Sequence, residues 1–416
     1  LVDLPGPKIR VGAVAESVVL KPGDQIHFTV KAVVGSRREL SVTYERLPCE
    51  VRVGGSLFLN DGIIEMRIKS VDADLQGFWA QAVSSGEVSS HKGVNVPGGM
   101  LSIRPPTETD LQGISFGVEV DGDWFAMSFI RDRRDVENTK QAIEAAGGDQ
   151  PVISKIEHRD AVENIDEIID ASDGVMVARG DLGIEVPPWE VPLIQKKIVA
   201  KCNEVGKPVI VATQMLESML TNPRPTRAEA SDVANAIMDG ADAVMLSEET
   251  AVGQYPIEAV TVMSNISQTV EQKAPRREAR FPGEDAPIPE IIGSLASRAA
   301  EAVKPAAVLV VTRSGFSARM VSKHRPRTRI LAVTKSPRVG RRMRFYWGVE
   351  PLEVDWTDDR DELLVRTVEK SLERDFVCRE DAVMIVSGST LEAPGRTSTL
   401  EILRVEDILY HASRRD

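Results

Sequence analysis

The chain has 416 residues, of which 42% are hydrophobic and 27% are charged, so it has the composition of a globular protein with room for two or three domains. The formal net charge of −12 argues against a nucleic-acid partner, because non-specific binding to phosphates depends on clustered Lys and Arg. No stretch approaches the roughly 20 apolar residues of a membrane span and no signal-peptide pattern opens the chain, so we expect a cytoplasmic protein without a membrane partner.

A small β domain is predicted for the first part of the chain, from about Lys8 to Pro97. Short runs of alternating apolar and polar residues are separated there by Gly and by an Asn-Asp-Gly turn, a pattern typical of short strands. Examples of such runs are 25–30, 39–44 and 56–59, and the first three residues of the chain look like the end of one further strand.

Repeated strand–helix units follow from about Asp123. Strand-like segments alternate with amphipathic helical stretches, which implies parallel strands joined by right-handed crossovers and closed into a barrel. One helix start is marked by a capping box, Thr226 followed by Glu229, with Gly240 as a C-terminal stop. The predicted strands are 125–130, 152–157, 174–179, 209–213 and 243–246.

A segment rich in Pro and charge, about 273–287, is predicted to link this region to an open, mostly parallel α/β sheet. The strands of that sheet are expected at 306–311, 329–333 and 382–386. A basic run at 338–344 has the helical spacing of a solvated face or subunit contact, and a site for a small phosphorylated effector is a further interpretation.

Three cysteines, Cys49, Cys202 and Cys378, are too widely spaced to form a CxxC pair. They support neither a disulfide framework nor a structural zinc site, so we expect reduced thiols.

Polar side chains end the central predicted strands. Side chains alternate in direction along 152–157, so Lys155 and Glu157 face one way while Ser154 and Ile156 face the other. If the first face lines a barrel, the charged pair lies at the C-terminal mouth, where barrel enzymes place their chemistry. The ammonium needs Glu157 or an anionic ligand to be stable there. The alternative to a catalytic role for this pair is a purely structural ion pair inside the barrel.

Glu157 and Asp181 end consecutive strands and could converge on one Mg²⁺, with Mn²⁺ as a substitute. Magnesium prefers one or two carboxylates plus waters and substrate oxygens, and two carboxylates leave room for those. Gly180 and Asp181 also begin a predicted loop whose backbone N–H groups could hold a carboxylate or phosphate. A helix N-cap is the alternative for Asp181, and both roles could hold together.

Hydroxyl groups end the next two strands, at Thr213 and Ser247. They could orient a substrate or pass a proton through water. Because Thr is a poor acid, simple positioning and a part in a proton relay are equal alternatives for Thr213. Glu249 is a further site candidate, with ordering of its loop as the alternative.

Several motifs, in unbroken order, closely resemble the pyruvate kinase family, and the resemblance covers nearly all of the chain. It implies a TIM-type (β/α)8 barrel with an inserted small β-barrel lid domain and a C-terminal open α/β domain. The implied limits are 1–6 and 98–272 for the barrel, 7–97 for the lid, 273–287 for the linker and 288–416 for the regulatory domain. The motifs are DLPGPKIR at 3–10, KGVNVPG at 92–98, VISKIE at 152–157, VMVARGDLG at 175–183, ATQMLESM at 212–219, RPTRAE at 224–229 and MLSEET at 245–250.

The resemblance implies phosphoryl transfer from phosphoenolpyruvate to ADP, giving pyruvate and ATP in glycolysis. Lys155 would support the moving phosphoryl group, with Thr213 and Ser247 as further catalytic residues. Gly180, Asp181 and Thr213 would hold the carboxylate of phosphoenolpyruvate. The lid would close over the nucleotide, and its nucleotide-binding residues would be Arg10, Asp61 and Lys92. A hairpin turn with an exposed lysine is the alternative for the last two.

The chain departs from the family pattern in two places. The family's Arg-Leu-Asn-Phe-Ser-His-Gly motif has no match here, and the strand count falls short of eight, so we expect a fragment or incomplete gene model rather than a naturally shortened protein. The potassium-requiring pattern has Glu where this chain has Lys8 and Thr where it has Leu4. A fixed ammonium can replace the field of K⁺, so we expect activity that does not require potassium.

A loop in the last domain is a candidate phosphate site for an allosteric effector. Thr312, Ser314, Gly315 and Ser317 follow a predicted strand and open a predicted helix, where hydroxyls and free N–H groups could bind an anion. A structural N-cap is the alternative. The family resemblance also implies a homotetramer.

Two rival functions stay open on the sequence alone. Another phosphoenolpyruvate or pyruvate barrel enzyme, such as an aldol lyase, could use the same carboxylates. A catalytically inactive subunit of a hetero-oligomer would explain the absent motif.

Overall fold

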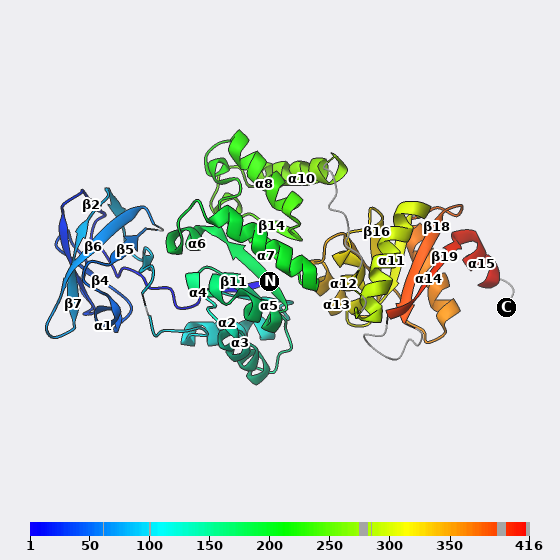
Figure 1. Ribbon diagram of the computed structural model, residues 1–416, viewed down its shortest axis with the longest axis horizontal. Helices are drawn as coiled ribbons and strands as arrows, with labels where there is room; N and C mark the ends of the chain where they lie inside the picture. Colours follow the sequence, from blue (N-terminus) through cyan, green and yellow to red (C-terminus); the bar gives the residue numbers. More distant parts are fainter. Residues whose placement is uncertain (61, 100, 274–281, 284, 389–396, 413–416) are drawn as a thin grey trace. The chain divides into compact units, whose positions relative to one another are not determined.

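The computed structural model describes residues 1–60, 62–99, 101–273, 282–283, 285–388 and 397–412 (Figure 1). The chain forms two compact units. The first comprises Leu1–Ile198, Val211–Glu229 and Met245–Val260, and the second comprises Val199–Ile210, Ala230–Val244 and Thr261–Asp416.

A β domain built around one apolar core occupies the early part of the first unit, shown in blue in Figure 1. One sheet has the order β4-β3-β7-β6-β5-β9, and β2 pairs with β8 in a second, smaller sheet. Phe28 and Phe78 stack at 5.1 Å inside this core, on strands that pair directly. The elements are β2 (Val18–Leu20), β3 (Gln25–Thr29), β4 (Glu39–Ser41), α1 (Leu47–Glu50), β5 (Ser56–Leu59), β6 (Ile64–Val71), β7 (Gly77–Ala82), β8 (Gly86–Val88) and β9 (Val94–Asn95).

The site is carried by a six-stranded sheet with the order β1-β10-β11-β12-β13-β14. The pairings from β1 to β12 are parallel, as the repeated strand–helix pattern predicts. Strands β10, β11, β12 and β13 are buried along most of their length, which explains their continuous apolar sequence. Their bounds are β1 (Val2–Leu4), β10 (Phe125–Met127), β11 (Val152–Ile156), β12 (Gly174–Ala178), β13 (Val209–Ala212) and β14 (Ala243–Met245).

Helices connect these strands, and the predicted capping box begins one of them. Thr226 Oγ1 accepts from Glu229 N at 3.2 Å while Glu229 Oε2 accepts from Thr226 N at 2.7 Å. Gly240 follows that helix with a φ of 101°, a left-handed conformation that glycine adopts freely. The elements are α2 (Glu108–Glu119), α3 (Arg133–Ala145), α4 (Arg159–Glu163), α5 (Ile165–Ala171), α6 (Arg179–Glu185), α7 (Val191–Val205), η1 (Glu217–Leu220), α8 (Arg227–Asp239), α9 (Glu248–Ala251) and α10 (Pro256–Lys273).

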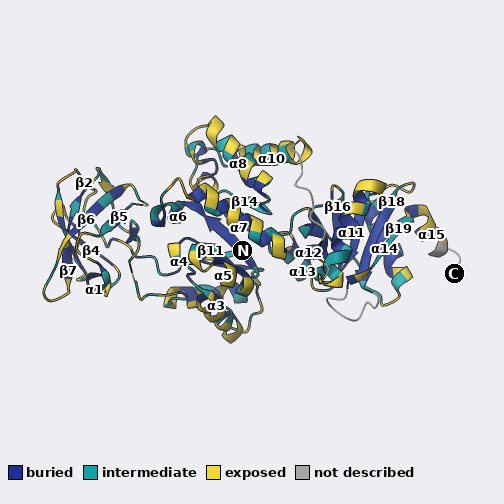
Figure 2. Cartoon of the chain, in the orientation of Figure 1, coloured by how far each residue is buried: buried dark blue, intermediate teal, exposed yellow. Residues whose placement is uncertain are grey.

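The C-terminal sheet has the order β17-β16-β15-β18-β19, and its central strands β16, β15 and β18 are buried on both faces (Figure 2). Helices α11, α12 and α13 cover one face, and α14 and α15 cover the other. All pairings are parallel except that of β18 with β19. The elements are α11 (Ile288–Val303), β15 (Ala307–Val311), α12 (Phe316–Lys323), β16 (Arg329–Thr334), α13 (Pro337–Met343), β17 (Val349–Glu353), α14 (Arg360–Glu373), β18 (Ala382–Gly388), β19 (Thr397–Arg404) and α15 (Val405–Ala412).

The predicted fold class is confirmed, while the domain limits given above stay predictions. Every strand expected from the sequence is present. The sequence did not specify β2, β6, β7, β8 or β9 of the β domain, nor β17 or β19 of the C-terminal sheet. The three cysteines are free thiols, as expected. Within the described residues, no helix is both long and apolar enough to span a bilayer.

Candidate active site

Strand β11 presents its charged residues and its small hydroxyl residue on opposite faces. Lys155 Nζ lies 3.1 Å from Glu157 Oε1. On the other face, Ser154 Oγ lies 2.6 Å from Ser172 Oγ and is buried. The predicted alternation is therefore confirmed, and it places the ion pair at the C-terminal end of the strand.

The ammonium group of Lys155 is held by groups from three strands. Besides Glu157, it lies 3.1 Å from Asp3 Oδ1 on β1 and donates to Ser128 Oγ at 2.8 Å, just after β10. Burial alone would lower the pKa of Lys155, but the charges of Glu157 and Asp3 and their hydrogen bonds outweigh it and raise the pKa above its usual value. The lysine therefore stays charged.

Glu157 is the most enclosed carboxylate of this group, with 1% of its side chain exposed. Its Oε2 accepts from Phe129 N at 2.8 Å, and Phe129 has a φ of 56°, which is unusual for a bulky residue. Burial raises the pKa of Glu157, the charge of Lys155 opposes that rise, and the charge of Asp181 adds to it. A second positive charge near Glu157 and Asp181 would therefore be stabilised.

Asp181 lies in the first turn of α6 and not in a loop, so that part of the sequence prediction is wrong. The N-cap of α6 is Ala178, which has no side-chain capping bond, so the N-cap alternative for Asp181 is also wrong. The strand ends one residue before Arg179 and the helix starts without a connecting turn. Lys8 Nζ lies 3.7 Å from Asp181 Oδ1.

Thr213 and Gly180 are brought together from neighbouring strand ends. Gly180 N donates to Thr213 Oγ1 at 2.8 Å, and that hydroxyl donates to Ala212 O at 2.6 Å. Thr213 and Gln214 have φ values of 68° and 53°, so two successive non-glycine residues are left-handed. Backbone conformations of this kind cluster at functional sites.

Ser247 lies at the N-cap of α9, two residues after the end of β14, and hydrogen bonds of Glu249 connect it to the loop after β13. The Glu249 carboxylate accepts from Leu216 N at 3.0 Å and from Ser247 N at 2.8 Å. Glu249 is buried, and these bonds fit the loop-ordering role that the sequence left open.

A metal ion would find two hard oxygen ligands here. Within the described residues, no group of three or more His, Cys, Asp or Glu side chains is arranged to hold a metal. Glu157 uses two of its lone pairs, one for Lys155 and one for Phe129, and a carboxylate offers about four. The donor set of Glu157 and Asp181 therefore fits Mg²⁺, which takes its other ligands from water and substrate.

Two of the predicted nucleotide-binding residues, Arg10 and Lys92, lie on neighbouring segments of the β domain. Arg10 forms an antiparallel bridge with Gly93, next to Lys92, and its Nη1 donates to His91 O at 2.9 Å. Asp61 lies outside the described residues. A Cβ added to the following residue, Gly62, would lie 3.1 Å from Ile184 of α6, so this loop of the β domain lies beside the helix that carries Asp181.

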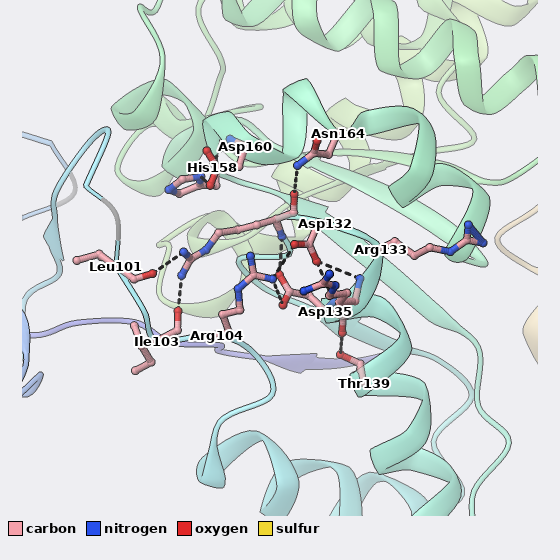
Figure 3. A network of polar contacts seen from close by, with 12 residues as sticks. Leu101, Ile103, Arg104, Asp132, Arg133, Asp135, Thr139, His158, Asp160 and Asn164 are labelled. Atoms are coloured by element: carbon pink, nitrogen blue, oxygen red, sulfur yellow. Dashed lines mark hydrogen bonds and ion pairs between the residues drawn. The ribbon is translucent and has the colours of Figure 1, made fainter. Parts of the chain in front are cut away.

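Both connections between the β domain and the parallel sheet are fixed by buried polar groups. Where the chain leaves the sheet, Gly6 N donates to Asp110 Oδ1 at 3.0 Å. Where it returns, Arg131 donates to Leu101 O at 2.6 Å and to Ile103 O, and Figure 3 shows both carbonyls turned toward the guanidinium. The network continues to Asn164, Arg104, Asp132 and Asp135.

In the predicted effector loop, two of the three hydroxyls are already engaged. Thr312 Oγ1 accepts from Gly315 N at 3.0 Å, and Ser317 Oγ lies 2.6 Å from Thr397 Oγ1. Ser314 is exposed. Gly315 itself is the N-cap of α12, with a φ of 85° and no side-chain bond.

Sequence reasoning missed three residues of the site: Asp3, Ser128 and Arg179. Ser128 lay inside the predicted strand 125–130, whereas the structure ends β10 at Met127 and leaves Ser128 at the end of the strand. Asp3 could be found only by knowing that β1 lies beside β10, although more than a hundred residues separate them. Arg179 donates to the carbonyl of Thr213 at 2.8 Å, a contact that depends on where α6 starts.

Comparison with known proteins agrees with this geometry. Residues 1–260 match the family model "Pyruvate kinase, barrel domain" and residues 290–403 match "Pyruvate kinase, alpha/beta domain". The chain is 42% identical over 412 residues to pyruvate kinase 2 of Synechocystis sp. and 41% identical over 414 residues to the pyruvate kinase of Geobacillus stearothermophilus. These matches cover 98% of the chain and 70% of each relative.

The pyruvate kinase of Clostridium acetobutylicum is 40% identical, with 97% of the chain and 86% of the relative covered. Neither an aldol lyase nor an inactive subunit is favoured by these relatives. The chain belongs to the pyruvate kinase family, the enzymes that transfer the phosphoryl group of phosphoenolpyruvate to ADP in glycolysis.

Proposed function

We propose that Lys155 stabilises the phosphoryl group as it passes from phosphoenolpyruvate to ADP. The observation that supports this is a charged ammonium held by Asp3, Glu157 and Ser128 at the ends of three parallel strands. Phosphoryl transfer requires positioning and neutralisation of charge on the equatorial oxygens, and a charge fixed in advance does not have to reorganise during the reaction. Lys155 meets that requirement.

Glu157 and Asp181 would hold Mg²⁺, and Mn²⁺ could take the same place. When bound, the ion neutralises negative charge on the substrate oxygens. The burial of Glu157 and the spare lone pairs of both carboxylates support this assignment. Lys155 orients Glu157 from one side, and Phe129 N orients it from the other.

Gly180, Asp181 and Thr213 would bind the carboxylate of phosphoenolpyruvate. In the present arrangement Gly180 N donates to the hydroxyl of Thr213, so the substrate carboxylate would replace that hydroxyl as the acceptor. Thr213 would then be free to turn toward the substrate. Its hydroxyl and that of Ser247 would position the enolate or pass a proton to it through water.

ADP would bind against Arg10 and Lys92 of the β domain, with Asp61 as a further contact. The adjacency of Arg10 and Lys92 supports a shared phosphate site. Approach of the β domain to the strand ends would exclude water and complete the site.

Lys8 would replace a bound K⁺, so the rate should not depend on potassium at constant ionic strength. Its position 3.7 Å from Asp181 supports this role. A rate that rises several-fold when Na⁺ is exchanged for K⁺ would contradict it.

Thr312, Ser314, Gly315 and Ser317 would bind the phosphate of an effector. The hydroxyls of Thr312 and Ser317 would have to leave their present partners, so Ser314 and backbone N–H groups would make the first contacts. A cytoplasmic homotetramer completes the proposal, and light scattering of the purified protein tests the assembly.

The decisive experiment measures pyruvate formation from phosphoenolpyruvate, ADP and Mg²⁺ by the wild type, Lys155→Met and Lys140→Met. Lys140 is a matched control, because it is also an ion-paired lysine, bound to Asp173 at 2.9 Å on the surface. We expect Lys155→Met to lower kcat by about 100- to 1000-fold and Lys140→Met to leave it unchanged. Activity retained by Lys155→Met would remove Lys155 from the mechanism.

A further inference from the structure

Arg179 is buried at the start of α6, immediately before Gly180 and Asp181, with 8% of its surface exposed. Its guanidinium donates to Thr213 O at 2.8 and 3.3 Å and to Gln214 O at 3.1 Å. Its Nη2 also lies 2.9 Å from Met215 Sδ. One side chain therefore spans three successive residues of the loop after β13.

The loop that Arg179 grips has a backbone that most residues avoid. Thr213 and Gln214 have φ values of 68° and 53°, where the Cβ atom crowds the backbone carbonyl. Conformations of this kind persist only where the surrounding structure holds them. Both carbonyls of the left-handed pair are the acceptors of Arg179, so the guanidinium binds the loop at the place where the backbone is least favourable.

We infer that Arg179 is a positioning residue for the carboxylate of phosphoenolpyruvate, an inference that rests on the substrate site proposed above. Arg179 and Gly180 hold the two sides of Thr213. The guanidinium binds its carbonyl, and the N–H of Gly180 binds its hydroxyl at 2.8 Å. Because the backbone is fixed by Arg179, an incoming carboxylate can take over the N–H of Gly180 after a rotation about one side-chain bond of Thr213.

Lysine cannot replace arginine in this role. The planar guanidinium presents five donors in a fixed fork, and all three of its nitrogens make contacts here. Nη2 binds both carbonyls, Nε donates to Thr213 O at 3.3 Å, and Nη1 donates to Gln195 Oε1 at 3.5 Å. The ammonium of a lysine keeps the positive charge but acts from a single point. Arg179→Lys therefore separates the geometry of the contact from its charge.

The test compares wild type, Arg179→Lys and Arg325→Lys by calorimetric binding of phosphoenolpyruvate with Mg²⁺ and by KM for each substrate. Arg325 is the matched control, because it also donates to a backbone carbonyl, that of Gly240 at 2.8 Å, and pairs with Asp242 in the second unit. We expect Arg179→Lys to raise the Kd and KM for phosphoenolpyruvate about tenfold or more and to leave the KM for ADP within about twofold. Arg325→Lys should lower the unfolding temperature and leave both KM values unchanged.

A second substitution asks whether the loop backbone is the cause. Glycine adopts a φ near 53° without strain, so Gln214→Gly should relieve the need for Arg179. We expect the double variant Arg179→Lys, Gln214→Gly to recover part of the lost affinity for phosphoenolpyruvate. Circular dichroism will show whether Arg179→Lys folds on its own. If it does not, the double variant gives the test: recovery of both the fold and phosphoenolpyruvate binding supports the positioning role, and recovery of the fold without binding contradicts it.

The outcomes separate this inference from the proposed function. Binding of phosphoenolpyruvate by wild type with no change in Arg179→Lys would overturn the positioning role and leave the proposed site intact. An equal rise in the KM for ADP, or no recovery on adding Gln214→Gly, would show that Arg179 only supports the fold. Absence of binding by wild type would overturn the proposed site and this inference together.

Discussion

Glu185 lies at the C-terminal end of α6, buried beside the imidazole of His158, whose Nε2 is 3.6 Å from Glu185 Oε2. That oxygen has no hydrogen-bond partner among the described residues. Burial raises the pKa of Glu185 to about 7, and burial lowers the pKa of His158. Near neutral pH, the buried pair is therefore stable chiefly when both groups are uncharged.

The stability of the protein should therefore fall as Glu185 is forced to ionise. In the unfolded chain Glu185 releases its proton near pH 4.5, whereas in the folded protein Glu185 keeps its proton up to about pH 7. The folded state thus binds more protons in that window, and the free energy of unfolding decreases as pH rises through it. Glu185→Gln cannot ionise, so we expect it to be more stable than wild type above pH 7, by at most about 3 kcal/mol.

Thermal unfolding of both proteins at pH 5 and pH 8 measures this difference. A matched His158→Gln variant reports how much the imidazole contributes to the pH dependence of stability. The charged groups near His158 are Asp160, Arg131 and Arg159. A stability difference that is the same at both pH values would mean that Glu185 does not carry its proton in the folded protein.

At the scale of residues, the sequence predicted contacts between residues that are close along the chain and missed contacts between residues that are distant along it. The Lys155–Glu157 pair follows from two-residue alternation in one strand, so it could be predicted. The contacts of Arg179 with residues 213–215 could not, because they require knowing that α6 begins one residue after β12 ends. The N-cap alternative for Asp181 was wrong for the same reason.

At the scale of elements, the two connections to the β domain are held by single polar side chains. The return connection depends on Arg131, which binds the carbonyls of Leu101 and Ile103. We expect Arg131→Lys to release this segment, because lysine cannot bind both carbonyls as a fork. Hydrogen exchange of the amides at 101–104 should become about tenfold faster.

Amides of β3 and β7 are the internal control for that measurement, because they lie in the core of the β domain and pair with each other. Their exchange should not change. Faster exchange throughout the β domain would show that Arg131 stabilises the whole domain and not its connection.

In the C-terminal sheet, the two strands that the sequence did not predict, β17 and β19, are both edge strands. β17 contains Pro351, which removes a backbone donor and is tolerated at an edge. β19 is half exposed and antiparallel to β18, so it lacks the continuous apolar run of its neighbours. The central strands β15, β16 and β18 carry that run and were predicted.

At the scale of the whole molecule, the strand order shows what local patterns leave out. Successive strand–helix units predict that β10, β11 and β12 are neighbours, and they are. The parallel pairing of β1 with β10 spans the entire β domain, and only family resemblance implied it. The inserted β domain therefore separates β1 from β10 in the sequence, yet the two strands lie side by side in the sheet.

The alternation in β11 also limits how this protein can change during evolution. A substitution on one face of the strand leaves the contacts of the other face in place, because Ser154 and Lys155 face different surroundings. A single-residue insertion or deletion between Val152 and Glu157 is different, since it would exchange the two faces of the strand from that point on. Change in length here can come only in steps of two, because an odd change would move one member of the ion pair to the opposite face of the strand.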